Sequence, residues 1–140
     1  MALVLGSLQK AVSALAGVLA KSDDVEFMNH LDDVARTAIR AGVIQHFEFT
    51  YELCWKFIKR WLETNISPAA ADGVTRRELF RLGAENRLLD DVEQWMRYHE
   101  ALNLTSHIYQ PEISERVYNT AHDFARDAAR LLAALEARND

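Results

Sequence analysis

Three scarcities in this sequence already exclude several classes of protein. Its 140 residues include one cysteine, Cys54, which cannot form an internal disulfide. The surrounding apolar run YELCWKFI favours a buried, unreactive thiol, and a reducing, cytoplasmic setting fits. No run of about 18 apolar residues is present, so no segment is predicted to span a membrane. A basic surplus is also missing: the net charge of −5 argues against tight, sequence-independent wrapping of nucleic acid, while it leaves a local basic patch open.

The N-terminal segment MALVLGSLQKAVSALAGVLAKS is apolar and rich in small residues, as a signal peptide would be. It lacks the basic first region of such a peptide, and Gln9 and Lys10 interrupt its apolar run, so a signal peptide is disfavoured. The shares of hydrophobic residues, 49%, and charged residues, 26%, are those of a soluble globular protein. The length fits a single domain that spans residues 1–140.

Helical periodicity runs through the first forty residues. Leucine and valine residues recur at spacings of three and four along one face of a first helix: Leu5, Leu8, Val12, Leu15 and Leu19. Asp23 and Glu26 then form a reciprocal capping pair, which predicts a second helix that runs to about Arg40. Gly42 weakens the helix locally, and the pattern does not decide whether the second helix continues through it.

The block VIQHFEFTYELCWKFIKRWLETN, residues 43–65, predicts the central helix. Its wide apolar stripe comprises Ile44, Phe47, Tyr51, Cys54, Trp55, Ile58, Trp61 and Leu62. Glu48, Glu52, Lys56 and Arg60 follow one another at i+4, so we interpret the two glutamates as surface ion-pair partners rather than as an acid–base pair. Core packing is the preferred interpretation of the tryptophans. A loop, NISPAAADG, follows.

Capping pairs predict the helices after this loop. Thr75 with Glu78 opens a short helix, and Asp90 with Glu93 opens a longer one that runs into the stretch ALNLTSHIYQ, residues 101–110. Pro111 suits the first turn of the last helix. Strand-like alternation, fixed-period repeats and low-complexity segments are missing from the sequence. We therefore predict an all-α, antiparallel helical bundle of four main helices plus a short extra helix.

The stretch ALNLTSHIYQ carries an unusual density of polar groups for a helix. On a continuous helix, His99, Asn103 and His107 would share one stripe. The two histidines would then lie about 12 Å apart along the axis, too far to share one metal ion, so no metal site is predicted. His107 could instead act as a general acid or base that Asn103 orients. The other interpretation is a half-buried histidine that is hydrogen-bonded inside the bundle, with the Asn, Thr and Ser of this stretch ending the helix, and spacing alone favours it.

Two blocks resemble a known family. IQHFEFTYELCWKFIKRWL and EQWMRYHEALNLTSHIYQPEISERVY are similar to the two characteristic blocks of the nucleotidyltransferase substrate-binding-like proteins, in the HEPN superfamily that includes the HepT toxins. The resemblance extends from about Val43 to Tyr118. It implies a helical bundle that dimerises and is paired with a small nucleotidyltransferase. In several such pairs the helical protein is a ribonuclease toxin and the nucleotidyltransferase is its antitoxin.

The family's ribonuclease motif is an arginine followed after four to six residues by a histidine, usually with a polar residue directly after the arginine. A tyrosine two residues after the histidine is the acceptor of AMP, and the dimer brings two motifs together around one cleft. Carried onto this sequence, the resemblance makes His107 the histidine, Asn103 the polar residue and Tyr109 the acceptor. Leu102 holds the position of the arginine and cannot bind a scissile phosphate.

Other arginines could compensate for Leu102. Arg97 is ten residues from His107 and about 80° around an ideal helix from it, which disfavours it. Arginines of a dimer mate are a second source, although a charge run on a short helix is usually a solvated face; the candidates are Arg76, Arg77, Arg81 and Arg87.

Three functional hypotheses follow. The first is a helical partner of a minimal nucleotidyltransferase in a toxin–antitoxin type pair, a cytoplasmic homodimer with the Asn103–Tyr109 patch at its cleft. The second is an active, metal-independent ribonuclease that uses His107 on RNA. The third, suggested by the family's older description, is a module that binds the nucleotidyltransferase's substrate, although the sequence shows no signature of a small-molecule pocket. No cofactor and no membrane association are predicted.

Overall fold

The computed structural model describes residues 2–139, and all regular elements in that part of the chain are helices. They are α1 (Gly6–Asp23), α2 (Val25–Asn29), α3 (Asp33–Asn65), α4 (Arg76–Glu85), α5 (Val92–Asn103), the 3₁₀ helix η1 (Thr105–His107) and α6 (Pro111–Ala137). The predicted all-α bundle is confirmed. None of these helices combines the length and the hydropathy needed to cross a membrane.

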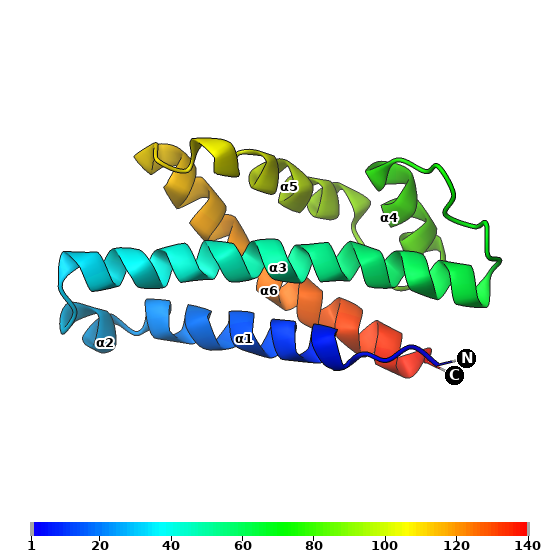
Figure 1. The fold of residues 1–140 in the computed structure, drawn as a ribbon, viewed down its shortest axis with the longest axis horizontal. Helices are drawn as coiled ribbons and strands as arrows, with labels where there is room; N and C mark the ends of the chain where they lie inside the picture. Colours follow the sequence, from blue (N-terminus) through cyan, green and yellow to red (C-terminus); the bar gives the residue numbers. More distant parts are fainter. Residues whose placement is uncertain (1, 140) are drawn as a thin grey trace.

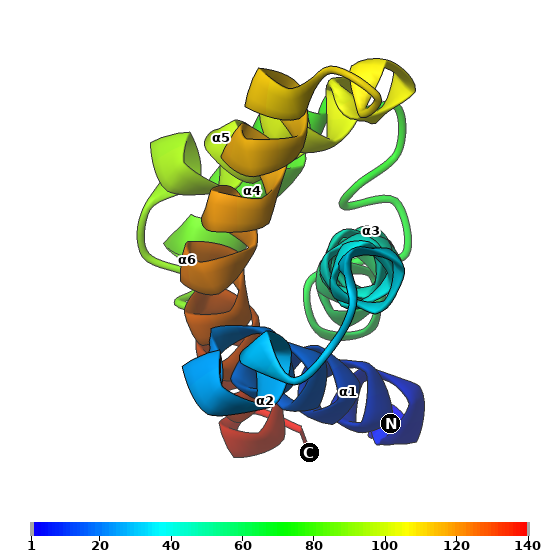
Figure 2. The ribbon, with the colours of Figure 1, turned by 90° about the vertical axis from the view of Figure 1, so that its left-hand side faces the viewer.

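The long helices α1, α3 and α6 form the body of the bundle. α1 runs antiparallel to α3 along its length, and α6 crosses α3 at an angle (Figure 1). α5 packs on α6, and α4 packs between α3 and α5. Figure 2 shows α6 extending from the α5 side of the molecule to the α1 side. The two chain ends meet, because the backbone N–H of Leu3 donates to Asn139 Oδ1 at 2.7 Å.

The N-termini of four helices are closed by side-chain caps. A carboxylate or hydroxyl oxygen accepts the backbone N–H three residues on in each case, at 2.8–3.2 Å; the caps are Asp24, Asp32, Thr75 and Asp91. Such a cap satisfies an amide that has no partner within its helix. These side chains therefore decide where each helix begins.

Two predicted caps are wrong by one residue, and one predicted helix is wrong in extent. Asp23 is the last residue of α1, while Asp24 caps the short α2. Asp32 then opens α3, so the predicted second helix to Arg40 is instead a single turn followed by the start of α3. α5 likewise begins after Asp91 rather than Asp90. Asp24 and Asp91 have extended backbones and accept the N–H groups of Phe27 and Gln94, whereas Asp23 is still part of α1.

α3 is continuous through Gly42, which settles the question that the pattern left open. A Cβ at Gly42 would lie 3.6 Å from Val18 Cγ2 of α1, an ordinary contact. Gly42 therefore lies on the face of α3 that packs against α1. Its cost to helix propensity is offset by the packing of a 33-residue helix against the bundle.

An aromatic cluster joins α3, α5 and α6. The Phe124 ring of α6 stacks on Phe47 of α3 at 4.7 Å between centroids and meets Tyr98 and Trp95 of α5 edge-on at 5.1 and 5.8 Å. All four side chains are buried. Cys54 is also fully buried, as predicted, and burial raises the pKa of its thiol. The cluster sets the position of α5 relative to α3, and with it that of the polar stretch that follows α5.

Candidate functional site

The polar stretch is the point at which α5 ends, in agreement with the interpretation in which its Asn, Thr and Ser end the helix. The stripe that a continuous helix would form through His99, Asn103 and His107 is therefore absent. α5 stops at Asn103, and η1 holds Thr105–His107 in a tighter 3₁₀ turn. Thr105 Oγ1 donates to the carbonyl oxygen of Leu102 at 2.8 Å, and the N–H of His107 donates to the carbonyl of Leu104 at 2.9 Å. The threonine thus satisfies a carbonyl that the ending helix leaves free. His107 consequently leaves the line of His99 and Asn103.

His107 and Tyr109 lie together on the surface. Their ring centroids are 6.4 Å apart, and Tyr109 is 76% exposed in the short segment between η1 and α6. His107 is exposed as well. A large aromatic side chain with this exposure is accessible to a second macromolecule.

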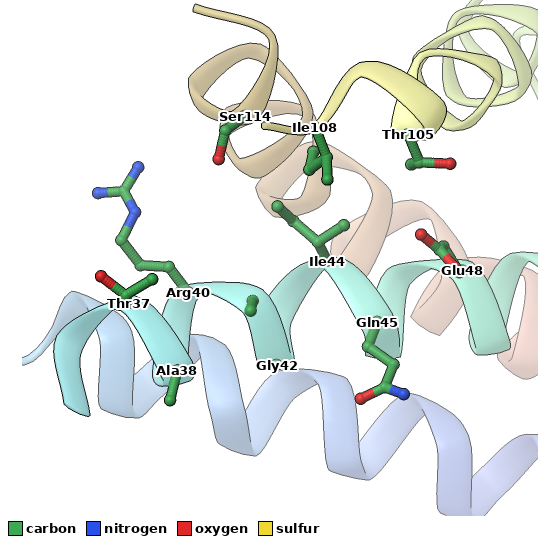
Figure 3. A pocket seen from close by; sticks show the side chains of 11 residues that line it. Thr37, Ala38, Arg40, Gly42, Ile44, Gln45, Glu48, Thr105, Ile108 and Ser114 are labelled. Carbon is green, nitrogen blue, oxygen red and sulfur yellow. The ribbon is translucent and has the colours of Figure 1, made fainter. Parts of the chain in front are cut away.

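The polar stretch also forms one wall of a groove along α3, which we call the α3 groove. Its volume is about 800 Å³, and it is lined by Thr37, Ala38, Arg40, Ala41, Gly42, Ile44, Gln45, Glu48, Thr105, Ile108 and Ser114. Ile44 and Ile108 point toward each other across it (Figure 3). The sequence carried no sign of this groove, because its two walls are about sixty residues apart in the chain.

A smaller cavity, which we call the Arg76 pocket, adjoins the α3 groove. Its volume is about 260 Å³, and its lining residues are Glu48, Tyr51, Glu52, Arg76, His99, Leu102, Asn103 and Thr105. Glu48 and Thr105 line both spaces. The structure therefore brings Asn103 together with His99 in one pocket, which His107 and Tyr109 do not line.

Arg76 is the functional candidate whose position the sequence analysis missed. Its guanidinium carbon lies 3.8 Å from the centroid of the Trp55 ring and 5.9 Å from that of Tyr51. It lines the pocket of its own chain beside Leu102, whereas the sequence analysis considered it only as an arginine of a dimer mate. No local pattern predicts this placement, because the contact joins α3, α4 and α5.

The other arginines considered for this role lie elsewhere. Arg77 forms an ion pair with Glu93 of α5, and Arg97 donates to Gln94 Oε1 on its own helix. Arg81 and Arg87 are exposed and do not line the pocket. Arg76 is therefore the one arginine of this set that lines the pocket holding Leu102 and Asn103.

The two glutamates of the Arg76 pocket, Glu48 and Glu52, differ in their partners and in the direction of their pKa shifts. Glu52 accepts the Trp55 indole N–H at 3.0 Å and pairs with Lys56 at 3.3 Å, which confirms its predicted ion pair. Partial burial by itself would raise the pKa of Glu52, but these partners outweigh it, and the pKa is lowered. Glu48 forms no ion pair within residues 2–139, contrary to prediction, because its i+4 neighbour is Glu52. Burial raises the pKa of Glu48.

A histidine–tyrosine pair completes the Arg76 pocket. The Tyr51 hydroxyl and His99 Nδ1 are hydrogen-bonded at 2.8 Å. Burial, assisted by the positive charge of Arg76, lowers the pKa of His99, so its imidazole is neutral at neutral pH. Burial also raises the pKa of Tyr51, which keeps its phenol protonated. No group of three or more His, Cys, Asp or Glu side chains that could hold a metal ion occurs in the described part of the chain.

Together, the fold and the site define an all-α bundle with an exposed His–Tyr turn and a two-part groove along its longest helix. The family model described as "Nucleotidyltransferase substrate binding protein like" matches residues 3–137. The chain belongs to this family, which confirms the resemblance seen in the sequence.

Individual relatives agree with this assignment. The chain is 32% identical to the "Probable ribonuclease HepT" of Haemophilus influenzae, over 96% of this chain and 93% of that protein. A solved structure from Haemophilus influenzae, described as revealing the fold of a substrate binding domain of a nucleotidyltransferase, superposes with a TM-score of 0.90 at 28% identity, covering 95% of this chain and 99% of the other. A Thermus thermophilus protein shares the fold, with a TM-score of 0.68 at 24% identity over 89% and 98% of the two chains.

Proposed function

We propose that this protein is the helical partner of a minimal nucleotidyltransferase in a toxin–antitoxin type pair in the cytoplasm. In this proposal the chain forms a homodimer, the Asn103–Tyr109 patch lines the dimer cleft, and the nucleotidyltransferase approaches that patch. Membership of the nucleotidyltransferase substrate-binding-like family supports the choice of partner. The observation that carries the proposal is the exposure of Tyr109 beside His107.

Tyr109 is the proposed acceptor of the nucleotidyl group. Its phenol oxygen attacks the α-phosphorus of ATP, the bond between the α- and β-phosphates breaks, and pyrophosphate leaves with its electron pair. The phenol proton passes to a base of the nucleotidyltransferase or to water. The product is a phosphodiester between Tyr109 and AMP, which places a negative charge next to His107.

The test of this function is the mass of the peptide that contains Tyr109. After incubation with a minimal nucleotidyltransferase and ATP, we expect that peptide to gain the mass of one adenylate, and Tyr109→Phe to prevent the gain. Tyr118→Phe is the matched control, because Tyr118 is a buried tyrosine of α6. An unmodified peptide from the wild-type protein would contradict the proposal.

The second candidate function is a metal-independent ribonuclease that uses His107, and the similarity to the "Probable ribonuclease HepT" favours it. In such a reaction the 2′-hydroxyl oxygen attacks the adjacent phosphorus, a base takes the hydroxyl proton, and the 5′-oxygen leaves with a proton from an acid. His107 would serve as the base or the acid, and Asn103, four residues earlier in the sequence, would be the polar residue of the motif. Leu102 cannot stabilise the phosphorane, so the activity depends on another cation.

Cleavage of a mixed tRNA and mRNA pool tests the second function. If the protein is a ribonuclease, we expect His107→Ala to abolish cleavage and Leu102→Arg to raise it, because the arginine restores charge stabilisation of the transition state. The His107→Ala protein also controls for contaminating nuclease. Equal cleavage by all three proteins would exclude His107 as the source.

A further inference from the structure

Arg76 forms no ion pair among residues 2–139, although its charge acts on the Glu52 carboxylate of the same pocket and helps to lower the pKa of that group. The six ion pairs of arginine and lysine in the described chain, and the His122–Asp23 contact, involve other side chains. Its Nη1 atom is buried and has no hydrogen-bond partner. An unused donor on a charged group is costly, and the missing acceptor is one that a bound anion would provide.

The guanidinium is nevertheless held in place. It lies 3.8 Å above the Trp55 ring and 5.9 Å from the Tyr51 ring, in the geometry of a cation–π interaction. Its aliphatic stem is fixed at the first residue of α4, directly after the Thr75 cap. A binding group that is positioned before the ligand arrives loses less conformational freedom on binding.

The remaining groups of the Arg76 pocket are compatible with an anion. Glu52 is engaged by Lys56 and by the Trp55 indole N–H, which offsets its charge. Glu48 has a raised pKa and more readily takes the proton that would let it donate to an anion. Asn103 adds an amide, and the Tyr51–His99 pair is neutral, so neither adds a second negative charge.

The size of the pocket limits what it can accept. Sites for drug-sized ligands measure about 300–1,000 Å³, so a pocket of about 260 Å³ suits a single small group rather than a whole nucleotide. The α3 groove begins at Glu48 and Thr105 and offers about 800 Å³ more, with Ile44 and Ile108 as apolar walls (Figure 3). A group attached to the anion therefore has room to extend along α3.

We propose that the Arg76 pocket is a phosphate-binding subsite in which the Arg76 guanidinium and the Asn103 amide bind the phosphate, and that the attached nucleoside or RNA strand lies in the α3 groove. Arginine suits this role because its planar fork of donors matches the oxygens of a phosphate. The proposal does not rest on Tyr109, which does not line the pocket.

The Trp55 indole is a built-in reporter for this proposal. It lies under Arg76 and donates to Glu52, so binding at Arg76 changes its surroundings. We expect inorganic phosphate, added at constant ionic strength, to shift the Trp55 indole N–H resonance of ¹⁵N-labelled protein in a saturable way. The indole of Trp95, buried in the aromatic cluster, should not shift. Trp55→Phe assigns the resonance, and a wild-type spectrum without a saturable shift would overturn the proposal.

Two alanine variants distinguish phosphate binding in the Arg76 pocket from non-specific attraction to a positively charged surface. Arg76→Ala should weaken phosphate binding at least tenfold. Arg81→Ala removes the same charge from an exposed position on the same helix and should leave the affinity within twofold of the wild type. Arg76→Gln, which retains most of the stem on Trp55, gives the same comparison if Arg76→Ala does not fold. Equal affinity in wild type, Arg76→Ala and Arg76→Gln would overturn the assignment.

AMP and a short single-stranded RNA with 2′-O-methyl groups, which cannot be cleaved, distinguish the two sources of phosphate. The natural source should bind more tightly than inorganic phosphate, shift the backbone amides of Ile44 and Ile108, and lose affinity in Arg76→Ala. RNA or AMP that binds equally well to Arg76→Ala would overturn the subsite for that ligand. These measurements use the isolated protein without a nucleotidyltransferase. A negative result therefore bears on the phosphate subsite and not on whether Tyr109 accepts AMP.

Discussion

At the scale of single residues, the pocket that contains Leu102 has no arginine at the motif position but does have a positive charge, which Arg76 supplies. Leu102 stands where the resembling ribonuclease motif has an arginine, and an apolar side chain cannot stabilise a phosphate there. Arg76 lines the same pocket from a different helix. The chemistry available near Asn103 is therefore not what the motif alone indicates.

The same pocket sets the protonation of His99. Burial, and then the charge of Arg76, lowers the pKa of His99 below the ordinary value of 6.5. A histidine whose pKa is lower in the folded state than in the unfolded state contributes stability that is present above the ordinary value and lost as the pH falls through the folded value. The free energy of unfolding should therefore decrease as the pH falls below 6.5.

An NMR titration of the His99 ring protons checks this prediction. We expect a midpoint below 6.5 in the wild-type protein and a higher midpoint in Arg76→Ala, which removes a positive charge that disfavours protonation of His99. His99→Gln should reduce the loss of stability at low pH. A wild-type midpoint at or above 6.5 would contradict the inferred environment.

At the scale of helices, the boundaries depend on which of two neighbouring side chains reaches an amide. Aspartate pairs precede both α2 and α5, and in each pair the second residue is the cap. The end of α5 is equally local, because Thr105 binds the Leu102 carbonyl and η1 redirects the chain. This change of direction separates His107 from Asn103 and brings His107 close to Tyr109.

The caps of α5 provide a direct comparison. Asp91→Ala should lower the free energy of unfolding by about 1 kcal/mol, because the Gln94 N–H loses its acceptor. Asp90→Ala should change it by less than about 0.5 kcal/mol, as expected for a surface substitution away from a cap. Urea unfolding of both variants measures the difference. A larger loss of stability in Asp90→Ala than in Asp91→Ala would show that Asp91 is not the cap of α5.

At the scale of the whole molecule, one aromatic side chain joins the helices that carry the site. Phe124 contacts Phe47 of α3 and Tyr98 and Trp95 of α5. The α3 groove and the Arg76 pocket lie between these same helices and the turn after α5. The core and the candidate site are thus parts of one packing arrangement.

Replacement of Phe124 tests that arrangement. Phe124→Ala should lower the free energy of unfolding by about 3–5 kcal/mol, because it removes a fully buried ring and leaves a cavity among four aromatic partners. Phe124→Leu, which retains most of the volume, should cost clearly less. Denaturant unfolding measures both. A loss below about 1 kcal/mol in Phe124→Ala would show that the cluster does not hold α5 on α3.

The sequence by itself determined the fold class, the central helix, the caps to within one residue and the family. These features follow from local periodicity, capping chemistry and two diagnostic blocks, all of which act over a few turns of helix. Even the stretch that ends α5 was recognisable as unusual, and the interpretation in which its Asn, Thr and Ser end the helix agrees with the end of α5 at Asn103.

Only the tertiary structure decided which side chains share a site. Arg76 reaches Leu102 and Asn103 because α4 packs between α3 and α5, and the α3 groove exists because the turn after α5 faces residues about sixty positions earlier. Periodicity assigns a residue to a face of its own helix but carries no information on which helix lies opposite. That choice is made by the packing of the aromatic core, which brings the Arg76 guanidinium and the Asn103 amide into one pocket.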